Sequence, residues 1–261
     1  MGIFNGVVIC LDFDGTMAYR GKVSKENGEA IAYFQSEGGI FCPCSGRRAH
    51  FFHECADIFR PNGPVVALNG SVILEYGATR AEDRVVYESI IPLDLAKDFA
   101  RDAVRIAGVK SIFLHHVEGP AKLIPDGKRD MDTEIDALTD DFRKIAVLHY
   151  PEAIDALRAT LEPKYADRMF FSSSDSEIYE TQMIGGDKGS SALRVKEMLG
   201  AHTLVCAGDY GNDIPMLKIA DIAYATGNAI DSVKAIAHRV TVPCTEHAIR
   251  AIVEDLKRDF S

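Results

Sequence analysis

The most informative stretch of the sequence is Val7-Val8-Ile9-Cys10-Leu11-Asp12-Phe13-Asp14-Gly15-Thr16. Its first half is a continuous apolar run, which is typical of a strand buried on both faces of a parallel sheet. Two carboxylates follow at once, and Gly15 permits a sharp turn close to a ligand. Because open α/β sheets bind ligands at the carboxyl ends of their strands, we expect Asp12 and Asp14 to project into such a crevice.

A second acidic cluster follows a second apolar run. Gly208-Asp209-Tyr210-Gly211-Asn212-Asp213 comes directly after 203–207, about two hundred residues beyond the first cluster. Two clusters at the same kind of strand end predict a shared pocket, and converging oxygen ligands favour Mg²⁺ over zinc. The alternative is that Asp and Gly serve here only as turn and cap residues, which are common after strands.

Two shorter segments fit an anion site. Ser45-Gly46-Arg47 follows the expected strand 40–44, so the Ser45 hydroxyl and nearby N–H groups can grip an anion at a helix start. Ser45 can instead be a simple helix cap, and Arg47 either touches substrate or lies on a solvated helix start. Asn69 is a short amide at the tip of a core strand, where it faces the crevice.

Lys188 begins a helix, where the helix dipole favours anions rather than cations. This placement is understandable if the ammonium points at a bound phosphate. Otherwise Lys188 is a solvated surface lysine.

Strand and helix patterns alternate at both ends of the chain, which predicts a parallel sheet with right-handed crossovers. The predicted strands are 7–11, 40–44 (ending early because of Pro43), 65–68, 203–207 and 222–225. The predicted helices are one capped by Ser24, then 49–59, 190–199, 214–219 and 247–258. Between them the pattern changes, with strands at 85–86, 112–114 and 145–148 and helices at 93–107 and 151–161. We therefore expect an α/β core, residues 1–77 and 187–261, interrupted by an inserted domain, residues 78–186.

Composition excludes several classes of protein. The chain has 261 residues and a net charge of −10, so phosphate backbones and anionic membranes repel it. It has no apolar run long enough for a transmembrane helix, and its N-terminus lacks the features of a signal peptide. Its six cysteines suit free thiols in a reducing compartment. We expect a cytoplasmic protein that binds neither nucleic acid nor membrane.

Several other polar residues could have functional roles, but structural roles explain them more simply. His115 and His116 are adjacent on a strand, so at most one points inward, and surface or packing roles are expected. Ser172-Ser173-Ser174 and Glu180 could select a hydroxylated leaving group, but a polar loop is the simpler interpretation. The acidic stretch 126–141 is expected to form a solvated face.

The motif order resembles the haloacid dehalogenase-like (HAD) superfamily, and more closely its Cof-type, C2B-capped branch. The motifs are Asp-x-Asp-Gly-Thr at 12–16, Ser-Gly-Arg at 45–47, Asn-Gly-Ser at 69–71, Lys-Gly at 188–189 and Gly-Asp-x-x-Asn-Asp at 208–213. The resemblance implies a Rossmann-like parallel-sheet core with an inserted α+β cap. Ser45 stands where Thr is commoner, and Pro43 within the second strand is unusual.

The resemblance also implies roles for the first motif. Asp12 would attack phosphorus to give an aspartyl-phosphate. Asp14 would protonate the leaving oxygen and then activate the hydrolytic water. Mg²⁺ would be held by Asp12, the Asp14 backbone carbonyl, Asp209 and the neighbouring Asp213, and would offset repulsion between carboxylate and phosphate.

The remaining motifs would complete the site. Ser45 and Lys188 would stabilise the oxygens of the transferring phosphoryl group. Gly46, Arg47, Asn69 and Asn212 would contact substrate, and Asn212 and Asp213 would also orient Lys188.

These roles predict a Mg²⁺-dependent phosphatase that hydrolyses a small phosphorylated metabolite, a sugar phosphate or related phosphomonoester, as a monomer or homodimer. One alternative is a phosphomannomutase-like phosphomutase, which would need a bisphosphate activator and release no net phosphate. Another is a non-catalytic metabolite-binding protein. Such a protein would show no turnover on any phosphomonoester, and it has no need for both carboxylates of the first motif.

Overall fold

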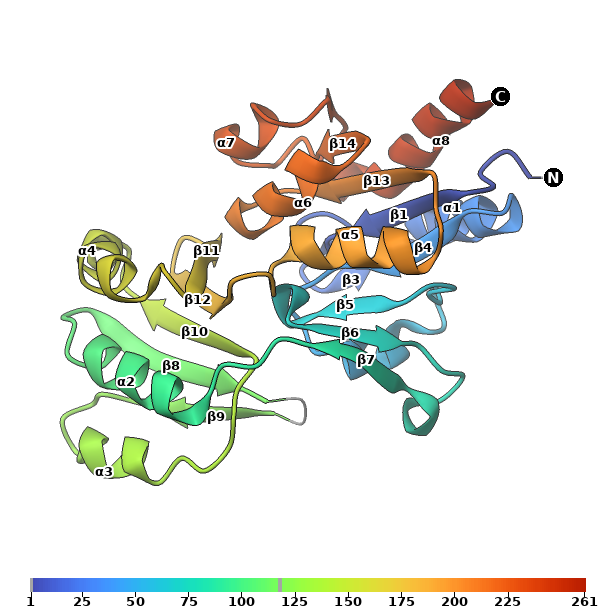
Figure 1. Cartoon of the computed structure of the whole chain (residues 1–261). Coiled ribbons are helices and arrows are strands. Elements are labelled where there is room, and N and C mark those ends of the chain that lie inside the picture. The colour runs from blue at the N-terminus through green and yellow to red at the C-terminus, as the bar shows by residue number, and fades with distance from the viewer. Residues whose placement is uncertain (1, 117–118) are drawn as a thin grey trace. The chain divides into compact units, whose positions relative to one another are not determined.

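The computed structural model describes residues 2–116 and 119–261, and the chain divides into two compact units (Figure 1). Unit 1 comprises Met1–Tyr87 and Lys188–Ser261, and unit 2 comprises Glu88–Asp187. An inserted unit thus interrupts the first one. The first boundary falls ten residues later than we expected from the sequence, because β7 (Arg84–Glu88) joins a sheet of unit 1.

Unit 1 is built on a five-stranded parallel sheet of order β15-β14-β13-β1-β4. Its strands are β1 (Val7–Leu11), β4 (Ile40–Pro43), β13 (Thr203–Gly208), β14 (Ile222–Ala225) and β15 (Arg239–Val240). All five residues of β1 are buried, as the continuous apolar run predicted. The central pair β1 and β13 runs in register, with Cys10 opposite Cys206, so both strands deliver their following residues to one edge of the sheet.

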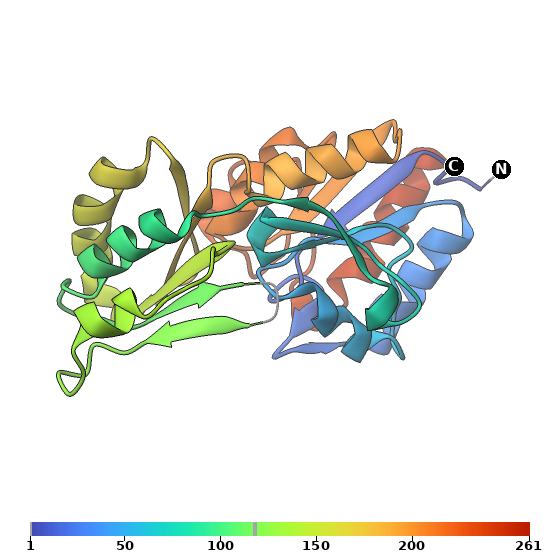
Figure 2. The ribbon, with the colours of Figure 1, turned by 60° about the horizontal axis from the view of Figure 1, so that its bottom comes forward.

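Helices cover both faces of this sheet (Figure 2). Helices α1 (Lys25–Ser36) and α8 (Ala248–Phe260) pack on one face, where they share a core with Val7, Ile9 and Leu11. Helices α5 (Lys188–Met198), α6 (Ile214–Ile219) and α7 (Asp231–Lys234) pack on the other. Ser24 caps α1 by accepting a hydrogen bond from the Asn27 N–H, as predicted.

The expected strand at 65–68 does not join the parallel sheet as a full member. β5 (Val65–Ala67) instead pairs antiparallel with β6 (Val72–Glu75), and β7 completes this small sheet. A single parallel bridge, Cys44 to Val66, links β5 to β4. The Cys44 N–H donates to the Leu11 carbonyl of β1, and the Ser45 N–H donates to the Val66 carbonyl of β5. Because successive residues of a strand face opposite neighbours, Pro43 faces β5 as Ser45 does. Proline has no N–H, so a hydrogen bond between β4 and β5 is missing at this position.

The expected helix at 49–59 is instead a 3₁₀ segment, η1 (Ala49–Cys55). Its buried residues, Ala49, Phe52 and Cys55, recur every three residues, which matches the three-residue turn of a 3₁₀ helix rather than the 3.6 of an α-helix. Phe52 is fully buried against the core of unit 1.

Short elements line the sheet edge that carries the motifs. They are the hairpin β2 (Ala18–Tyr19) and β3 (Lys22–Val23), with the 3₁₀ segments η2 (Leu68–Gly70), η5 (Gly211–Asp213) and η6 (Cys244–Glu246). A further 3₁₀ turn, η3 (Arg80–Glu82), precedes β7.

Unit 2 has an antiparallel sheet of order β11-β12-β10-β8-β9 with helices packed against it. The strands are β8 (Val109–His115), β9 (Pro120–Leu123), β10 (Lys144–His149), β11 (Met169–Asp175) and β12 (Ile178–Met183); the helices are α2 (Leu93–Ala103), α3 (Met131–Asp136), η4 (Pro151–Ala153) and α4 (Ile154–Tyr165). The polar-loop prediction for 172–174 was wrong. These serines belong to β11, and Glu180 lies on β12 opposite Ser172.

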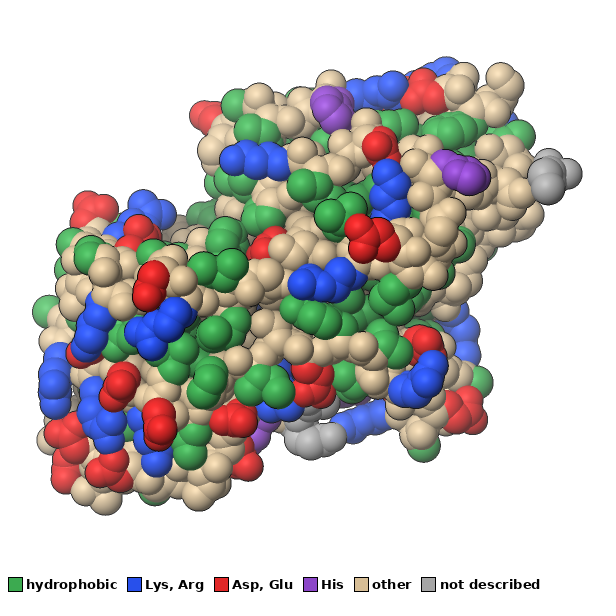
Figure 3. All heavy atoms as spheres, in the orientation of Figure 1, with side chains coloured by type: hydrophobic (Ala, Val, Ile, Leu, Met, Phe, Trp, Pro, Cys, Tyr) green, Lys and Arg blue, Asp and Glu red, His purple; other side chains and the backbone are tan. Residues whose placement is uncertain are grey.

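The surface of unit 2 mixes charges of both signs over α2 and α3 (Figure 3). The acidic stretch at 126–141 is mostly exposed to solvent, as expected, and Arg101 forms ion pairs with Asp132 and Asp136 within it. Among the described residues, none of the helices has the length and apolar character needed to cross a bilayer.

Candidate active site

The two acidic clusters meet at the carboxyl ends of β1 and β13. The Asp12 N–H donates to the Ala207 carbonyl at 3.0 Å, which extends the pairing of the two strands to the first motif. One carboxylate oxygen from each of Asp12, Asp209 and Asp213 lies within 4.8 Å of the others. Two segments about two hundred residues apart in the sequence therefore form one acidic group.

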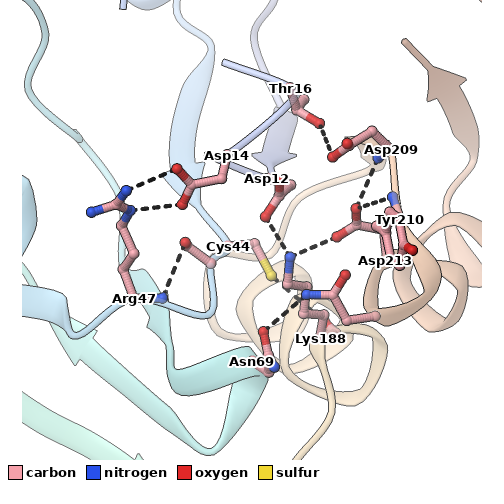
Figure 4. A network of polar contacts seen from close by, with 12 residues as sticks. Asp12, Asp14, Thr16, Cys44, Arg47, Asn69, Lys188, Asp209, Tyr210 and Asp213 are labelled. Atoms are coloured by element: carbon pink, nitrogen blue, oxygen red, sulfur yellow. Dashed lines mark hydrogen bonds and ion pairs between the residues drawn. The ribbon is translucent and has the colours of Figure 1, made fainter. Parts of the chain in front are cut away.

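Lys188 lies inside this group and is fully buried (Figure 4). Its Nζ donates to Asp12 Oδ1 at 2.5 Å and to Asp213 Oδ1 at 2.6 Å. Burial lowers the pKa of the Lys188 ammonium, but the charges of Asp12 and Asp213 outweigh it and hold that pKa well above its ordinary value. The surface-lysine alternative is wrong, because the lysine at the start of α5 is bound to the acidic group at the sheet edge.

The acidic group carries more negative charge than Lys188 neutralises. Burial raises the pKa of the Asp12 carboxyl well above its ordinary value despite the Lys188 ammonium, and the charges of Asp213 and Asp209 raise it further. Burial together with the Asp213 charge raises the pKa of Asp209 to about 7. Both shifts indicate a place where an additional cation would be stabilised.

Asp213 shapes the loop that follows β13. Its Oδ2 accepts hydrogen bonds from the Asp209 N–H at 2.8 Å and the Tyr210 N–H at 3.1 Å, while its Oδ1 binds Lys188. Gly208 is required at this bend, because a Cβ there would lie 2.4 Å from the Asp213 Cβ. Asp213 thus positions both Asp209 and Lys188.

The turn after Asp14 closes against Asp209. Gly15 has φ +81°, and a Cβ on it would lie 2.2 Å from Asp209 Oδ2, so only glycine fits. The Thr16 hydroxyl donates to Asp209 Oδ1 at 3.2 Å. Thr16 belongs to the first motif, but no role for its side chain was predicted.

Ser45, Asn69 and Asn212 form a second wall of the site. The Asn69 N–H donates to the Ser45 carbonyl at 2.9 Å, and the Asn212 side-chain amide donates to Asn69 Oδ1 at 3.1 Å. All three side chains are buried. Leu68 and Asn69 both have positive φ, 49° and 59°, a strained arrangement of the kind that recurs at functional sites.

Asp14 points away from Lys188 and toward Arg47 (Figure 4). Arg47 binds both of its oxygens, through Nε at 2.7 Å and Nη2 at 2.8 Å. This hydrogen-bonded carboxylate raises the pKa of the Arg47 guanidinium. The side chain of Asp14 lies outside the acidic group of Asp12, Asp209 and Asp213, so within the predicted metal set it can contribute only its backbone carbonyl.

Three further residues support the site and were missed in the sequence. The side chains of Asn228 and Thr226 donate to the Gly15 carbonyl at 2.9 and 3.4 Å, and the Cys44 thiol contacts the Lys188 carbonyl at 3.9 Å. Thr226-Gly227-Asn228 directly follows β14, the strand beside β13. A polar turn at the end of a core strand was the signal that could have found it.

The donor set of the acidic group suits Mg²⁺. It consists of carboxylate oxygens, which hard divalent cations prefer, and offers neither thiolate nor imidazole ligands. The raised pKa of Asp209, caused mainly by burial and by its neighbour Asp213, is relieved by positive charge at this position. The residues present therefore fit the expected ion.

A family model described as haloacid dehalogenase-like hydrolase matches residues 9–252. The chain belongs to this family. The prediction of an enzyme of the HAD superfamily is confirmed, as is its α/β core with a second, inserted unit.

Known relatives cover nearly the whole chain. The 5-amino-6-(5-phospho-D-ribitylamino)uracil phosphatases YitU and YwtE of Bacillus subtilis are 21% and 24% identical, over 95% of this chain and 96% and 97% of their own. A solved structure described as a HAD subclass IIB sugar phosphatase matches with a TM-score of 0.77 at 17% identity, covering 96% of this chain and 98% of its own. The chain is thus similar to phosphatases over nearly its full length and shares the fold of this HAD enzyme.

Proposed function

We propose that this protein is a Mg²⁺-dependent phosphatase of small phosphorylated metabolites that works through an aspartyl-phosphate on Asp12. The observation that carries the proposal is the buried Lys188 ammonium between Asp12 and Asp213, with Asp209 in the same acidic group. A lysine and a carboxylate nucleophile at one strand end serve transfer of an anionic phosphoryl group. A binding protein would have no use for the nucleophile.

Asp12 is arranged to attack with one oxygen. Lys188 holds Oδ1, and the structure gives Oδ2 no hydrogen-bond partner among the described residues. In the proposed first step Oδ2 forms a bond to phosphorus while the bond from phosphorus to the leaving oxygen breaks. Lys188 keeps the carboxylate oriented and neutralises part of the charge on the phosphoryl oxygens.

Asp14 moves the protons. As general acid it gives its proton to the leaving oxygen in the first step. As carboxylate it then takes a proton from the water that attacks the aspartyl-phosphate, which restores both Asp12 and Asp14 and releases inorganic phosphate. Half of its side chain is exposed, so it can exchange with the leaving group and with water.

Ser45 is placed to bind the transferring group. Its oxygen already accepts the Arg47 N–H at 3.2 Å, so its own hydroxyl hydrogen remains to be donated to a phosphoryl oxygen. Gly46, Arg47, Asn69 and Asn212 remain our proposal for further substrate contacts.

Asp12 and Asp209 would hold Mg²⁺ through carboxylate oxygens and Asp14 through its backbone carbonyl, beside Asp213. When bound, the ion supplies positive charge that offsets repulsion between the nucleophile and the phosphate. This requirement explains how a chain of net charge −10 can accept an anionic substrate.

The substrate class is supported by the relatives. The names of YitU and YwtE specify a phosphorylated ribityl compound, and the matched structure is described as a sugar phosphatase. We propose a phosphorylated sugar or polyol for this chain as well. A cytoplasmic location is supported by six cysteines, all of them free.

A panel of phosphorylated metabolites tests the proposal. Phosphate release is measured with Mg²⁺ and with EDTA, for the natural sequence and for Asp12→Asn. We expect release from one or more sugar phosphates that needs Mg²⁺ and is absent in Asp12→Asn. Release that is unaffected by EDTA would contradict the metal, and an isomer formed without phosphate release would show a mutase instead.

A further inference from the structure

The pairing of Arg47 with Asp14 needs an explanation beyond stability. The side chains of Asp14 and Arg47 are 53% and 35% exposed. Exposed ion pairs add little to the free energy of unfolding, because water screens them and holding two side chains together costs entropy. This pair nevertheless has the two-point geometry that fixes a carboxylate in one orientation.

Arg47 is itself held by aromatic rings. The guanidinium carbon lies 4.1 Å from the ring centre of Phe51 and 5.2 Å from that of Phe13. These two rings contact each other edge to face at 5.1 Å. A guanidinium packed on aromatic faces loses much of its rotational freedom, so the two rings orient its hydrogen-bond donors without the help of Asp14.

The backbone of Arg47 is equally constrained. Its N–H donates to Ser45 Oγ, and its carbonyl accepts the Leu68 N–H at 3.0 Å. Phe13 stands between Asp12 and Asp14 in the first motif, so the ring that supports Arg47 also fixes the segment carrying both acids. Two aromatic rings and two backbone hydrogen bonds thus hold Arg47 independently of Asp14.

We infer that Arg47 is the positioning residue for Asp14, a role that goes beyond contact with the substrate and rests on the proposed phosphatase function. While Asp14 is a carboxylate, Nε and Nη2 of Arg47 each donate to one of its two oxygens. When one oxygen carries the proton for the leaving group, the other still accepts from Arg47. Asp14 therefore turns about one retained hydrogen bond, gives its proton to the leaving oxygen as the bond to phosphorus breaks, and returns to two-point binding as a carboxylate.

This role predicts a dependence on the leaving group. A phosphate ester of an alkyl alcohol, such as glycerol 2-phosphate, needs its leaving oxygen protonated, whereas p-nitrophenyl phosphate expels a stable phenolate without it. For Arg47→Met we expect kcat/KM to fall about a hundredfold with glycerol 2-phosphate and less than about fivefold with p-nitrophenyl phosphate. The value of kcat/KM is compared because it reports the step in which the leaving group departs, before hydrolysis of the intermediate.

Two further variants separate positioning from other roles. Arg47→Lys keeps the charge but offers no two-point geometry, so it should recover only a small part of the loss with the alkyl ester. Arg47→Met combined with Asp14→Asn should be no worse with that ester than Asp14→Asn alone, because both changes disable the same group. Arg250→Met, on the exposed face of α8, is the matched control and should leave both substrates unchanged.

Equal losses with the two esters would overturn the inference, because they would show that Arg47 binds the phosphoryl group rather than Asp14. Full recovery by Arg47→Lys would overturn it as well. A readout without turnover keeps the inference testable if the phosphatase proposal itself fails. In the nuclear magnetic resonance spectrum of the substrate-free protein, we expect a slowly exchanging Nε–H signal of Arg47 that Asp14→Asn abolishes. A signal unaltered by Asp14→Asn would contradict the two-point binding of Asp14 by Arg47.

Discussion

Each unit contains a buried lysine on a buried carboxylate, and the two differ in the groups around the ion pair. In unit 2, Lys144 Nζ lies 2.7 Å from Glu180 Oε1, and among the described residues Glu180 does not belong to a group of three side chains that could hold a metal ion. In unit 1, Lys188 binds Asp12 and Asp213 and shares the acidic group with Asp209, so three carboxylates meet one ammonium. An ion pair outside such a group can be structural, whereas three carboxylates around one ammonium favour a further cation and thereby indicate the site of chemistry.

A cluster near the surface of unit 1, formed by Arg239, Asp255 and Asp259, shows the opposite pKa shift. Arg239 binds Asp255 and Asp259, and Arg258 also binds Asp255, so two carboxylates meet two cations near the surface. The hydrogen bond from the Tyr224 hydroxyl and those from Arg258 and Arg239 lower the pKa of Asp255 to about 2, against the opposing effect of burial. In the acidic group of unit 1, burial instead raises the pKa values of Asp12 and Asp209. Carboxylates near the surface with matching cations are thus stabilised as anions, whereas buried carboxylates that outnumber their cation are not.

The largest effect is expected for Asp12→Asn in unit 1. The amide cannot attack phosphorus, so turnover should fall on the order of 10⁴-fold or more. Because the amide keeps the shape of the carboxylate, circular dichroism and the melting temperature should show an intact fold. A rate of phosphate release by Asp12→Asn within tenfold of that of the natural sequence would refute Asp12 as the nucleophile.

The Lys144–Glu180 pair of unit 2 should respond in stability. Lys144→Met takes a buried ammonium away from the Glu180 carboxylate and should lower the free energy of unfolding by about 3–5 kcal/mol. Lys144→Met combined with Glu180→Met removes both charges and should restore most of that loss. Urea denaturation of the two variants measures this, and a double variant less stable than the single one would contradict a structural pair.

Lys188→Met should act mainly on the chemistry of unit 1. Loss of a preorganised charge beside the transferring group should lower kcat about 10²–10³-fold. Since the remaining acidic group is now more negative, Mg²⁺ should still bind. Isothermal titration with Mg²⁺ checks this second point, and loss of Mg²⁺ binding in Lys188→Met would argue against the three carboxylates as the metal group.

Mg²⁺ should stabilise the protein through the acidic group of unit 1. At a hundred times its dissociation constant, the ion should add about 2.7 kcal/mol to the free energy of unfolding and raise the melting temperature by several degrees. Asp209→Asn should remove most of this rise, while Glu180→Gln in unit 2 should not alter it. If the rise in melting temperature persists in Asp209→Asn, Asp209 is not a ligand of the ion.

The Arg239 cluster near the surface should give the smallest effect. Since the folded pKa of Asp255 is lowered from an ordinary 3.8 to about 2, its stabilisation is complete above about pH 4 and is lost as the pH falls toward 2. Asp255→Asn should cost about 0.2–1 kcal/mol at pH 6 and less at pH 3. Urea midpoints at the two pH values test this, and a larger cost at pH 3 would reverse the sign of the argument.

Local signals made the core of unit 1 predictable. The apolar run 7–11, the Ser24 cap and the acidic turns at 12–14 and 209–213 each report a structure formed by neighbours in sequence. The convergence of the acidic turns followed from the rule that parallel strands end at one edge, and the acidic group bears it out.

What could not be predicted depends on distant partners. Ser172–Ser174 lack the alternation of a strand and are held in β11 by pairing with β12. The departure of β5 from the parallel sheet follows from a donor missing at Pro43, which matters only once β4 and β5 are neighbours. The contact of Arg47 with Asp14 joins residues 33 positions apart, and its orientation depends on two aromatic rings that no local pattern announces.

The most direct test is to trap the covalent intermediate. Asp14→Asn, which lacks the base for the second step, is mixed with p-nitrophenyl phosphate and Mg²⁺, quenched in acid and examined by peptide mass spectrometry. We expect one added phosphoryl group, located on Asp12 and absent when EDTA replaces Mg²⁺. A phosphoryl group on any other residue, or none while the natural sequence releases phosphate under the same conditions, would contradict the assignment of the acidic group as the centre of catalysis.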